Sequence, residues 1–360
     1  MRVALLESFY TGSHKRWADG LAEHSSHDIQ LVTLPGAHWK WRMHGSAVTF
    51  ARALLASPER PDALLASDLT DVAALRGLLA REGMNLPVAV YFHENQITYP
   101  WSPGDPDPAL RRDQHYGWIN YTTALAADRV VFNSAYHRES FLVALPGFLG
   151  QFPDAPSLAD VQRIREKALV IAPGCDVEEA NRWRVPKDGG PPIVVWNHRW
   201  EFDKNPEAFF RTLIRLNEEG VDFRLVVLGE QFRHSPEIFR EAREKLRAHI
   251  LHWGYCDSRE EYYRWLWRAH VMPVTANQDF FGYSVVEGLY CGLTPLLPDR
   301  LAYPEHVADR SVLYTSDEEF IFRLRSILSD PSKYTTPHLT RNYSWTHVIG
   351  QYDRMFAELL

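Results

Sequence analysis

Short apolar runs alternate with segments of helical periodicity along the first half of the chain. The strands predicted from these runs are 3–6, 29–34, 63–67, 88–92 and 129–132. Helical patterns lie at 15–24, 72–81 and 134–145, and Ser134 is suited to cap the last of them. Strands that alternate with helices are typical of a parallel sheet with crossover helices. The first half therefore predicts an α/β domain.

The second half repeats this pattern, with strands predicted at 193–196, 223–228, 249–252, 271–274 and 294–297. A segment rich in proline and glycine at 186–192 is the best linker candidate. It predicts two doubly wound domains, at 1–180 and 190–342. Because ligands of open α/β sheets bind beyond the carboxyl ends of the strands, two such domains facing each other predict a cleft whose functional residues follow strands.

The last segment, 343–360, has the pattern of an amphipathic helix. Ser344 is a plausible cap, and apolar residues from Trp345 to Met355 recur on one face. This pattern fits a helix that crosses back to the first domain and equally fits a helix of the second domain.

Charge and cysteine content narrow the class of protein. The net charge of −7 disfavours a nucleic-acid-binding surface over the whole chain, although residues 31–60 carry four cations against one carboxylate. The three cysteines lack metal-ligand spacing and indicate a reducing compartment. Apolar runs are too short for a signal peptide or a membrane span. We expect a cytoplasmic protein with no membrane partner and no metal.

Two cations, Arg199 and Lys204, follow the strand predicted at 193–196. A guanidinium binds two phosphate oxygens in a fork, and an ammonium adds a point charge. Such a pair is suited to hold a diphosphate leaving group. The alternative is a solvated loop in which both cations pair with Glu201 and Asp203.

The segment from Asp279 to Glu287 indicates the other half of such a site. Gly282 allows close approach of the backbone to a ligand, and the helix that follows offers its free N–H groups to phosphate. Glu287 is placed to accept hydrogen bonds from ribose hydroxyls. Ser284 and Glu287 also fit a capping box, which serves only the helix. A capping box does not need Asp279, and this carboxylate favours a sugar-nucleotide site.

Two further candidates lie in the first half. His93, at the end of the strand at 88–92, is suited to hydrogen-bond a transferred sugar, although a histidine at a strand end is more often structural. Gly12 and Ser13, after the first strand, form a short loop able to approach a diphosphate. This loop lacks the full dinucleotide fingerprint, so NAD binding is weakly supported.

An aromatic and basic block stands at 38–44. Its ring and cation members are His38, Trp39, Lys40, Trp41 and Arg42. Indoles that stack on unpaired bases, beside cations for phosphates, are typical of single-stranded RNA binding. The alternative is a loop whose tryptophans fill the core while its charges face water.

The second half resembles the retaining GT-B glycosyltransferases. Their pattern has an Arg and a Lys after the first strand of the C-terminal domain and a Glu-x7-Glu motif, and here Arg199, Lys204, Asp279 and Glu287 match it. The first half resembles the tRNA-queuosine mannosyltransferases. The blocks that carry this second likeness are 6–14, 34–43, 91–96, 131–134, 196–201, 228–230 and 303–305.

The resemblance implies a GT-B fold of two Rossmann-like domains and transfer of mannose from GDP-mannose to queuosine in a tRNA anticodon. It implies Arg199 and Lys204 on the diphosphate, with Asp279 and His93 on the sugar. The donor-binding residues implied are Gly12, Ser13, Gly229, Gly254, Tyr255, Gly282, Tyr283, Ser284 and Glu287. Neither a cofactor nor a metal is expected. Asp279 departs from the Glu that the motif usually has, and this leaves the donor sugar unassigned.

Three alternatives are compatible with the residues. The nearest is a GT-B glycosyltransferase with another nucleotide-sugar donor or with a saccharide or lipid acceptor. A second is a sugar-nucleotide epimerase of the same shape. The third is an RNA-binding protein with a decayed transferase domain.

Overall fold

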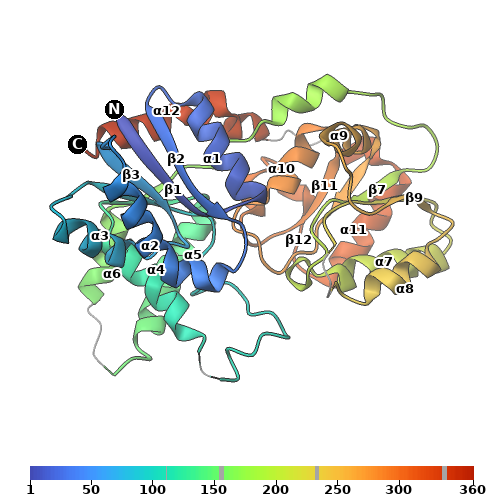
Figure 1. Ribbon diagram of the computed structural model, residues 1–360. Coiled ribbons are helices and arrows are strands. Elements are labelled where there is room, and N and C mark those ends of the chain that lie inside the picture. Colours follow the sequence, from blue (N-terminus) through green and yellow to red (C-terminus); the bar gives the residue numbers. More distant parts are fainter. Residues whose placement is uncertain (111, 154–157, 232–234, 335–338) are drawn as a thin grey trace. The chain divides into compact units, whose positions relative to one another are not determined.

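The computed structural model of the chain describes residues 1–110, 112–153, 158–231, 235–334 and 339–360. These residues form two compact units (Figure 1). The first unit contains residues 1–175 and 343–360, and the second contains residues 176–342. The division thus falls after Cys175, ahead of the boundary expected near 180–190.

The first unit is built on a six-stranded parallel sheet with the strand order β2-β1-β3-β4-β5-β6. Its strands are β1 (Arg2–Tyr10), β2 (Asp28–Pro35), β3 (Ala63–Ser67), β4 (Val88–Phe92), β5 (Arg129–Phe132) and β6 (Ala168–Val170). Successive residues of β1 enter different cores, because side chains alternate across a strand. Val3 and Leu5 pack on one side of the sheet, while Ala4 and Leu6 pack on the other.

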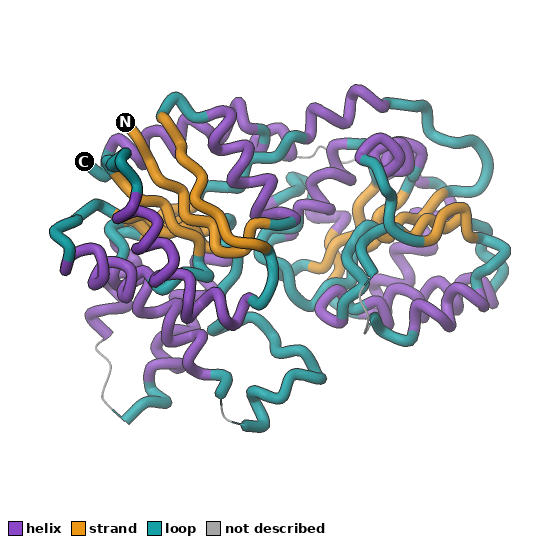
Figure 2. The backbone as a smooth tube through the Cα atoms, viewed as in Figure 1, coloured by secondary structure: helices purple, strands orange, loops and turns teal. Residues whose placement is uncertain are grey.

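Helices cover both faces of this sheet (Figure 2). One face carries α1 (Gly12–His24) and α12 (Trp345–Ala357). The other carries α2 (Trp39–Ala56), α3 (Val72–Arg81), α4 (Gln114–Ala126), α5 (Ala135–Leu149) and α6 (Leu158–Glu166). The Ser134 side chain accepts a hydrogen bond from the His137 backbone N–H, which confirms the predicted cap of α5. The doubly wound α/β architecture predicted from the sequence is confirmed for this unit.

The C-terminal helix α12 packs against α1. An added Cβ at Gly20 would lie 2.3 Å from the Trp345 indole, and one at Gly174 would lie 2.1 Å from it. The Trp17 indole N–H donates to the Tyr352 hydroxyl over 3.0 Å. Two glycines therefore leave room for one indole, and these long-range contacts hold the chain end in the first unit.

The second unit has another six-stranded parallel sheet, with the order β12-β11-β10-β7-β8-β9. Its strands are β7 (Ile193–Trp196), β8 (Arg224–Val227), β9 (Ile250–Trp253), β10 (Val271–Pro273), β11 (Thr294–Pro298) and β12 (Leu313–Tyr314). Helices α7 (Pro206–Glu218), α8 (Ile238–Lys245) and α11 (Asp317–Ser329) pack on one face. The other face carries α9 (Arg259–Arg268), α10 (Tyr283–Tyr290) and the 3₁₀ helix η1 (Val177–Trp183).

The segment at 186–192, expected to link the domains, is part of the second unit. The Asp188 carboxylate receives two hydrogen bonds from the Arg268 guanidinium, at 2.9 and 2.7 Å. Lys187 donates to the Ala269 carbonyl. Arg259 likewise donates to Glu179 of η1 over 2.7 Å. These contacts with α9 explain why the second unit begins earlier than the composition of the chain suggests.

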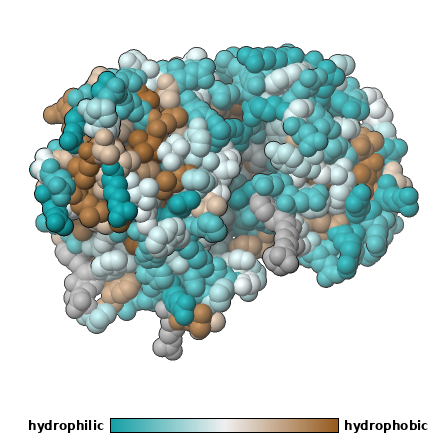
Figure 3. All heavy atoms as spheres, viewed as in Figure 1, coloured by the Kyte–Doolittle hydropathy of each residue, from teal (hydrophilic) through white to brown (hydrophobic). Residues whose placement is uncertain are grey.

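Hydrophobic side chains reach the surface of the first unit over the region of β1, β2 and α2 (Figure 3). Leu31 of the edge strand β2 and Val48 of α2 are exposed, by 37% and 40% respectively. Partly exposed apolar side chains are normal on a protein surface. Of the helices in the described part of the chain, none has the length and apolar content to cross a bilayer.

Candidate functional site

The loops that follow β7 and β8 lie in direct contact in the second unit. Gly229 has φ +99°, and an added Cβ there would lie 2.0 Å from the His198 carbonyl oxygen. The Trp200 backbone N–H donates to the Glu230 carbonyl over 3.0 Å. Only glycine adopts this backbone conformation readily and also fits beside the carbonyl oxygen. Gly229 thus brings the β8 loop against the loop that carries the predicted cations.

Lys204 ends the short 3₁₀ helix η2 (Phe202–Lys204) and is buried. Its Nζ donates to the Gln278 carbonyl over 2.8 Å and lies 3.1 Å from Asp203 Oδ2 and 3.6 Å from Asp279 Oδ2. Burial acts to lower the pKa of Lys204, but Asp279 and Asp203 outweigh it and the pKa is raised. Two predicted site residues therefore meet as a buried ion pair.

Asp279 is fixed on its other sides by Tyr303 and the backbone. The Tyr303 hydroxyl donates to Asp279 Oδ2 over 3.2 Å. Burial acts to raise the pKa of Asp279, but the charge of Lys204 lowers it below its usual value. At Gly282, where φ is +89°, an added Cβ would lie 3.3 Å from the Tyr303 ring. The ionised carboxylate thus sits in a tightly packed corner at the start of α10.

The capping-box alternative for α10 is wrong. The N-cap is Gly282, and α10 has no capping side chain within the described residues. The Ser284 hydroxyl instead lies 2.9 Å from His198 Nδ1. Glu287 accepts hydrogen bonds from the Tyr262 hydroxyl over 2.8 Å and the Tyr263 hydroxyl over 3.3 Å. Glu287 opens the second turn of α10, which begins at Tyr283, and so lies beyond the first turn in which a capping residue acts.

The loop after β7 is tied to α10 by two side chains. The Asn197 amide donates to the Ser284 carbonyl over 2.7 Å. His198 is buried, and its pKa is lowered to about 4 by burial and by the charge of Lys204. His198 is therefore neutral at pH 7 and bonds to Ser284 without adding charge.

Other predicted donor residues stand nearer the surface. Arg199 has a half-exposed side chain, and its Nη2 lies 3.0 Å from Glu201 Oε2. Tyr255 is 66% exposed beyond β9, beside Gly254. Tyr283 packs its ring edge-on against Phe281, with 5.3 Å between the ring centroids. The structure thus joins Lys204 to Asp279 in one buried contact and leaves Arg199 and Tyr255 accessible.

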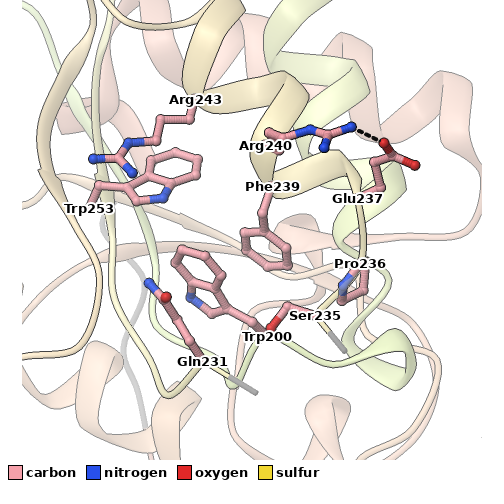
Figure 4. Close-up of a pocket in the computed structure, with 9 residues that line it drawn as sticks. All are labelled: Trp200, Gln231, Ser235, Pro236, Glu237, Phe239, Arg240, Arg243 and Trp253. Atoms are coloured by element: carbon pink, nitrogen blue, oxygen red, sulfur yellow. Dashed lines mark hydrogen bonds and ion pairs between the residues drawn. The ribbon is translucent and has the colours of Figure 1, made fainter. Parts of the chain in front are cut away.

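A cavity of about 440 Å³ lies beside α8 in the same unit (Figure 4). Trp200, Phe239 and Trp253 give it aromatic walls, and the Arg240 and Arg243 side chains lie at its edge. The Arg240 guanidinium pairs with Glu237. Trp200 directly follows Arg199 in the sequence, but the predicted site residues do not line this cavity.

In the first unit, His93 meets two side chains that the sequence interpretation did not combine with it. Glu7 continues the face of Val3 and Leu5 on β1, and His93 continues the face of Tyr91 on β4, so both point toward α1. Glu7 Oε2 lies 3.3 Å from His14 Nδ1 and 3.6 Å from His93 Nε2. The signal that could have found Glu7 is a carboxylate that interrupts a buried apolar strand.

Gly12 and Ser13 open α1, directly before His14. Gly12 has φ +52°, and within the described structure the side chain of the N-cap residue, Thr11, makes no capping hydrogen bond. Asp68, which follows β3, accepts a hydrogen bond from the His93 backbone N–H over 2.9 Å. The carboxyl ends of β1, β3 and β4 therefore gather charged and polar groups beneath the start of α1.

The block at 38–42 is not a loop but the start of α2, and its members have different surroundings. Lys40 lies between Asp105 and Asp107, 2.7 and 2.5 Å from their carboxylates. Trp39 packs near Tyr116, with 5.1 Å between ring centroids, whereas Trp41 is 64% exposed. The block therefore mixes a half-buried ring and a paired cation with one accessible indole.

The two ends of this block are also held by backbone contacts. His38 precedes α2 in a left-handed conformation, with φ +59°. The Arg42 guanidinium donates to the Pro35 carbonyl over 3.1 Å. The conformation of His38 and the contact of Arg42 together set the entry of the chain into α2.

Comparison with known families divides the chain where the structure does. Residues 2–175 match a family model described as tRNA-queuosine alpha-mannosyltransferase N-terminal. Residues 177–341 match the model of glycosyl transferases group 1. The boundary between the two matches coincides with the division between the two units.

A curated relative from Drosophila melanogaster, named tRNA-queuosine alpha-mannosyltransferase, is 33% identical over 324 residues, which are 88% of this chain and 84% of the relative. Solved structures share the two-domain GT-B fold. Sucrose-phosphate synthase from Thermosynechococcus elongatus has a TM-score of 0.70 at 14% identity, and the match covers 100% of this chain and 99% of the synthase chain. Anabaena HepE, solved with UDP and glucose, has a TM-score of 0.67 at 12% identity and covers 99% of this chain and 100% of its own.

Proposed function

We propose that this chain, which belongs to the tRNA-queuosine alpha-mannosyltransferase family, transfers mannose from GDP-mannose to the queuosine base of a tRNA anticodon. The enzyme is a glycosyltransferase. The observation that carries the proposal for the donor half is the buried Lys204–Asp279 pair, because it sets a cation for phosphate beside a carboxylate for sugar hydroxyls. Acting on tRNA, the enzyme would work in the cytoplasm, without a membrane.

The cations would stabilise the diphosphate as it leaves. Negative charge grows on the leaving group when the sugar–oxygen bond breaks, and fixed donors lower the barrier because they need no rearrangement. Lys204 already has three partners, so a phosphate oxygen must take the place of one of them. Asp279, at 3.6 Å, is the most distant of the three. Arg199, accessible on the same loop, would supply the second cation.

The start of α10 would hold the rest of the donor. Its first backbone N–H groups are suited to phosphate oxygens, because a helix N-terminus carries partial positive charge. Glu287 would accept from the ribose hydroxyls, and its two tyrosine partners would keep the carboxylate in place. The sugar would pass through an oxocarbenium-like state with retention of its anomeric configuration.

The first unit would receive the tRNA. His93 would hydrogen-bond a hydroxyl of the sugar or of the cyclopentene diol of queuosine. The exposed indole of Trp41 would stack on an unpaired base of the anticodon loop, which proteins recognise mainly through stacking.

One observation supports a second candidate, in which the donor carries another sugar. Asp279 stands where related glycosyltransferases have Glu, and the packing of Tyr303 around it fixes the carboxylate. A carboxylate one methylene shorter selects hydroxyls at different positions.

The test is transfer to queuosine-containing tRNA with a panel of nucleotide sugars, followed by digestion to nucleosides and mass spectrometry. We expect one added hexose on queuosine with GDP-mannose and none on tRNA that carries guanosine at that position. Addition only with another donor would support the second candidate. Donor consumption without a modified nucleoside would contradict transfer to tRNA.

A further inference from the structure

Glu7 is fully buried, and both of its carboxylate oxygens lie beside polar groups. Its Oε1 accepts from the Phe9 backbone N–H over 2.8 Å and from the Ser67 hydroxyl over 3.0 Å. Its Oε2 faces the imidazoles of His14 and His93. Ser67 lies on β3, the strand between β1 and β4, so the sheet itself holds the carboxylate at this point. Because Glu7 is fully buried, a substrate does not reach its carboxylate, and any role of Glu7 is exerted through its neighbours.

The two imidazoles are too close to share one carboxylate as two cations. Their ring centroids lie 4.0 Å apart, and their side chains are 12% and 8% exposed. Like charges at this separation repel strongly in a buried site, and one carboxylate compensates only one of them. The geometry therefore allows one charged and one neutral histidine.

The surroundings decide which histidine carries the charge. His14 is nearer to Glu7 and also feels the carboxylates of Asp68 and Glu94; although burial opposes it, Glu7 raises the pKa of His14 to about 9. His93 lies edge-on to the rings of Trp17 and Tyr91, with ring centroids 4.7 and 4.8 Å away. Burial and the charge of His14 lower the pKa of His93 to about 4.

Two further groups face this cluster. Asp68 is buried, and burial raises its pKa well above the usual value. His137 of α5 is buried too, and burial lowers its pKa well below the usual value. Both shifts favour the uncharged forms, and Asp68, where ionised, favours a charged His14, so neither group reverses the assignment of His14 and His93.

We propose that Glu7 and His14 are positioning residues that form a fixed ion pair and thereby keep the imidazole of His93 uncharged and oriented. The carboxylate opposite Nε2 of His93 favours the tautomer with its proton on that nitrogen. Nδ1 then keeps its lone pair and accepts a hydrogen bond from a substrate hydroxyl. A charged His93 would lose this lone pair. The inference rests on the proposed function, because it concerns the hydroxyl that His93 contacts during transfer.

Replacing His14 by Gln separates this role from a structural one. Without the charge of His14, Glu7 has only His93 as an ionic partner, so the pKa of His93 rises. Below the raised pKa His93 becomes charged and transfer falls; above it transfer recovers. We expect the ratio of kcat/KM at pH 6 to that at pH 8.5 to drop about tenfold relative to wild type, which corresponds to a His93 pKa raised to about one unit above pH 6. His24→Gln, at the other end of α1, is the matched control and should keep the wild-type ratio.

A second measurement does not depend on activity. NMR titration of protein labelled with ¹³C at histidine Cε1, with the signal assigned through His93→Asn, reports the protonation of His93 directly. We expect it to titrate at higher pH in His14→Gln than in wild type. If His14→Gln does not fold, Glu7→Gln is used, and His14 should then titrate at lower pH than in wild type.

Several results would overturn the inference. One is an equal loss of transfer at every pH together with an unchanged His93 titration. Another is one bound metal ion per chain by elemental analysis, since the same three side chains could surround a cation. Absence of transfer by the wild-type enzyme would instead refute the proposed function, and the NMR titration would still decide the roles of Glu7 and His14.

Discussion

The Nζ of Lys204 lies 3.6 Å from Oδ2 of Asp279, and both side chains are largely buried. They come from different loops of the second unit, one after β7 and one before α10. Each keeps the other charged in a place where neither charge would be stable alone. This mutual dependence makes the pair testable through both catalysis and stability.

Lys204→Ala should lower the rate of transfer by a factor of about 100 or more, because the leaving diphosphate loses a fixed cation. It should also lower the free energy of unfolding by about 3–5 kcal/mol, since Asp203 and Asp279 stay buried without their partner. Steady-state kinetics and urea unfolding measure the two effects. Lys245→Ala, which breaks an exposed pair with Glu241, is the control. Transfer by Lys204→Ala at the wild-type rate would remove Lys204 from the diphosphate.

The contribution of Asp279 to the free energy of unfolding should decrease as the pH falls. Its pKa in the folded chain is below the ordinary 3.8, so its ionised form stabilises the fold above that value. The contribution is lost as the pH falls through the lowered pKa. The difference in unfolding free energy between wild type and Asp279→Asn should therefore be constant from about pH 7 to 5 and shrink below about pH 4. A difference that grows toward acid would contradict the ion pair.

Gly229→Ala should damage the donor site more than Gly190→Ala does. Both glycines have positive φ, at +99° and +93°, so both variants carry similar backbone strain. Only at Gly229 does the new Cβ collide with a backbone atom, the His198 carbonyl oxygen. We expect Gly229→Ala to be less stable than Gly190→Ala and to bind the nucleotide sugar more weakly, by thermal unfolding and calorimetry. Equal behaviour would show that the two loops separate easily.

Trp41→Ala should affect tRNA binding, whereas Trp39→Ala should affect stability. Trp41 is exposed, so its loss should weaken tRNA binding by about 1–3 kcal/mol, the usual contribution of one stacked base, without changing the melting temperature. Trp39 packs with Trp101 and Tyr116, so its loss should lower the melting temperature. Fluorescence anisotropy with labelled tRNA measures the first effect. Unchanged tRNA affinity in Trp41→Ala would exclude Trp41 from the RNA-binding surface.

The sequence predicted the strands well because buried parallel strands are continuous apolar runs. The strands at 63–67, 88–92, 129–132 and 193–196 were confirmed at the predicted residues. Helix α2 was missed because its first residues are tryptophans and cations that conceal the helical period. The short edge strands β6 and β12 were missed because they have few residues to form a pattern.

The candidate site was predictable in its residue types but not in its partners. Lys204 and Asp279 were both named, yet their direct contact depends on how two loops fold together. The tyrosines that hold Glu287 come from α9, and local spacing gave no sign of them. Glu7 could not be recognised as a site residue from the sequence. Its two histidine neighbours lie on α1 and directly after β4, and only the folded sheet brings them to it.

The C-terminal helix has a consequence for how the chain is made. Since α12 belongs to the first unit, that unit is interrupted by the whole of the second and is completed only after the second has been synthesised. Until then Trp17, and the side of the sheet it packs on, lack part of their cover. Loss of residues 343–360, which spares every donor-site residue of the second unit, would therefore destabilise the first unit, whose sheet was synthesised long before its last helix.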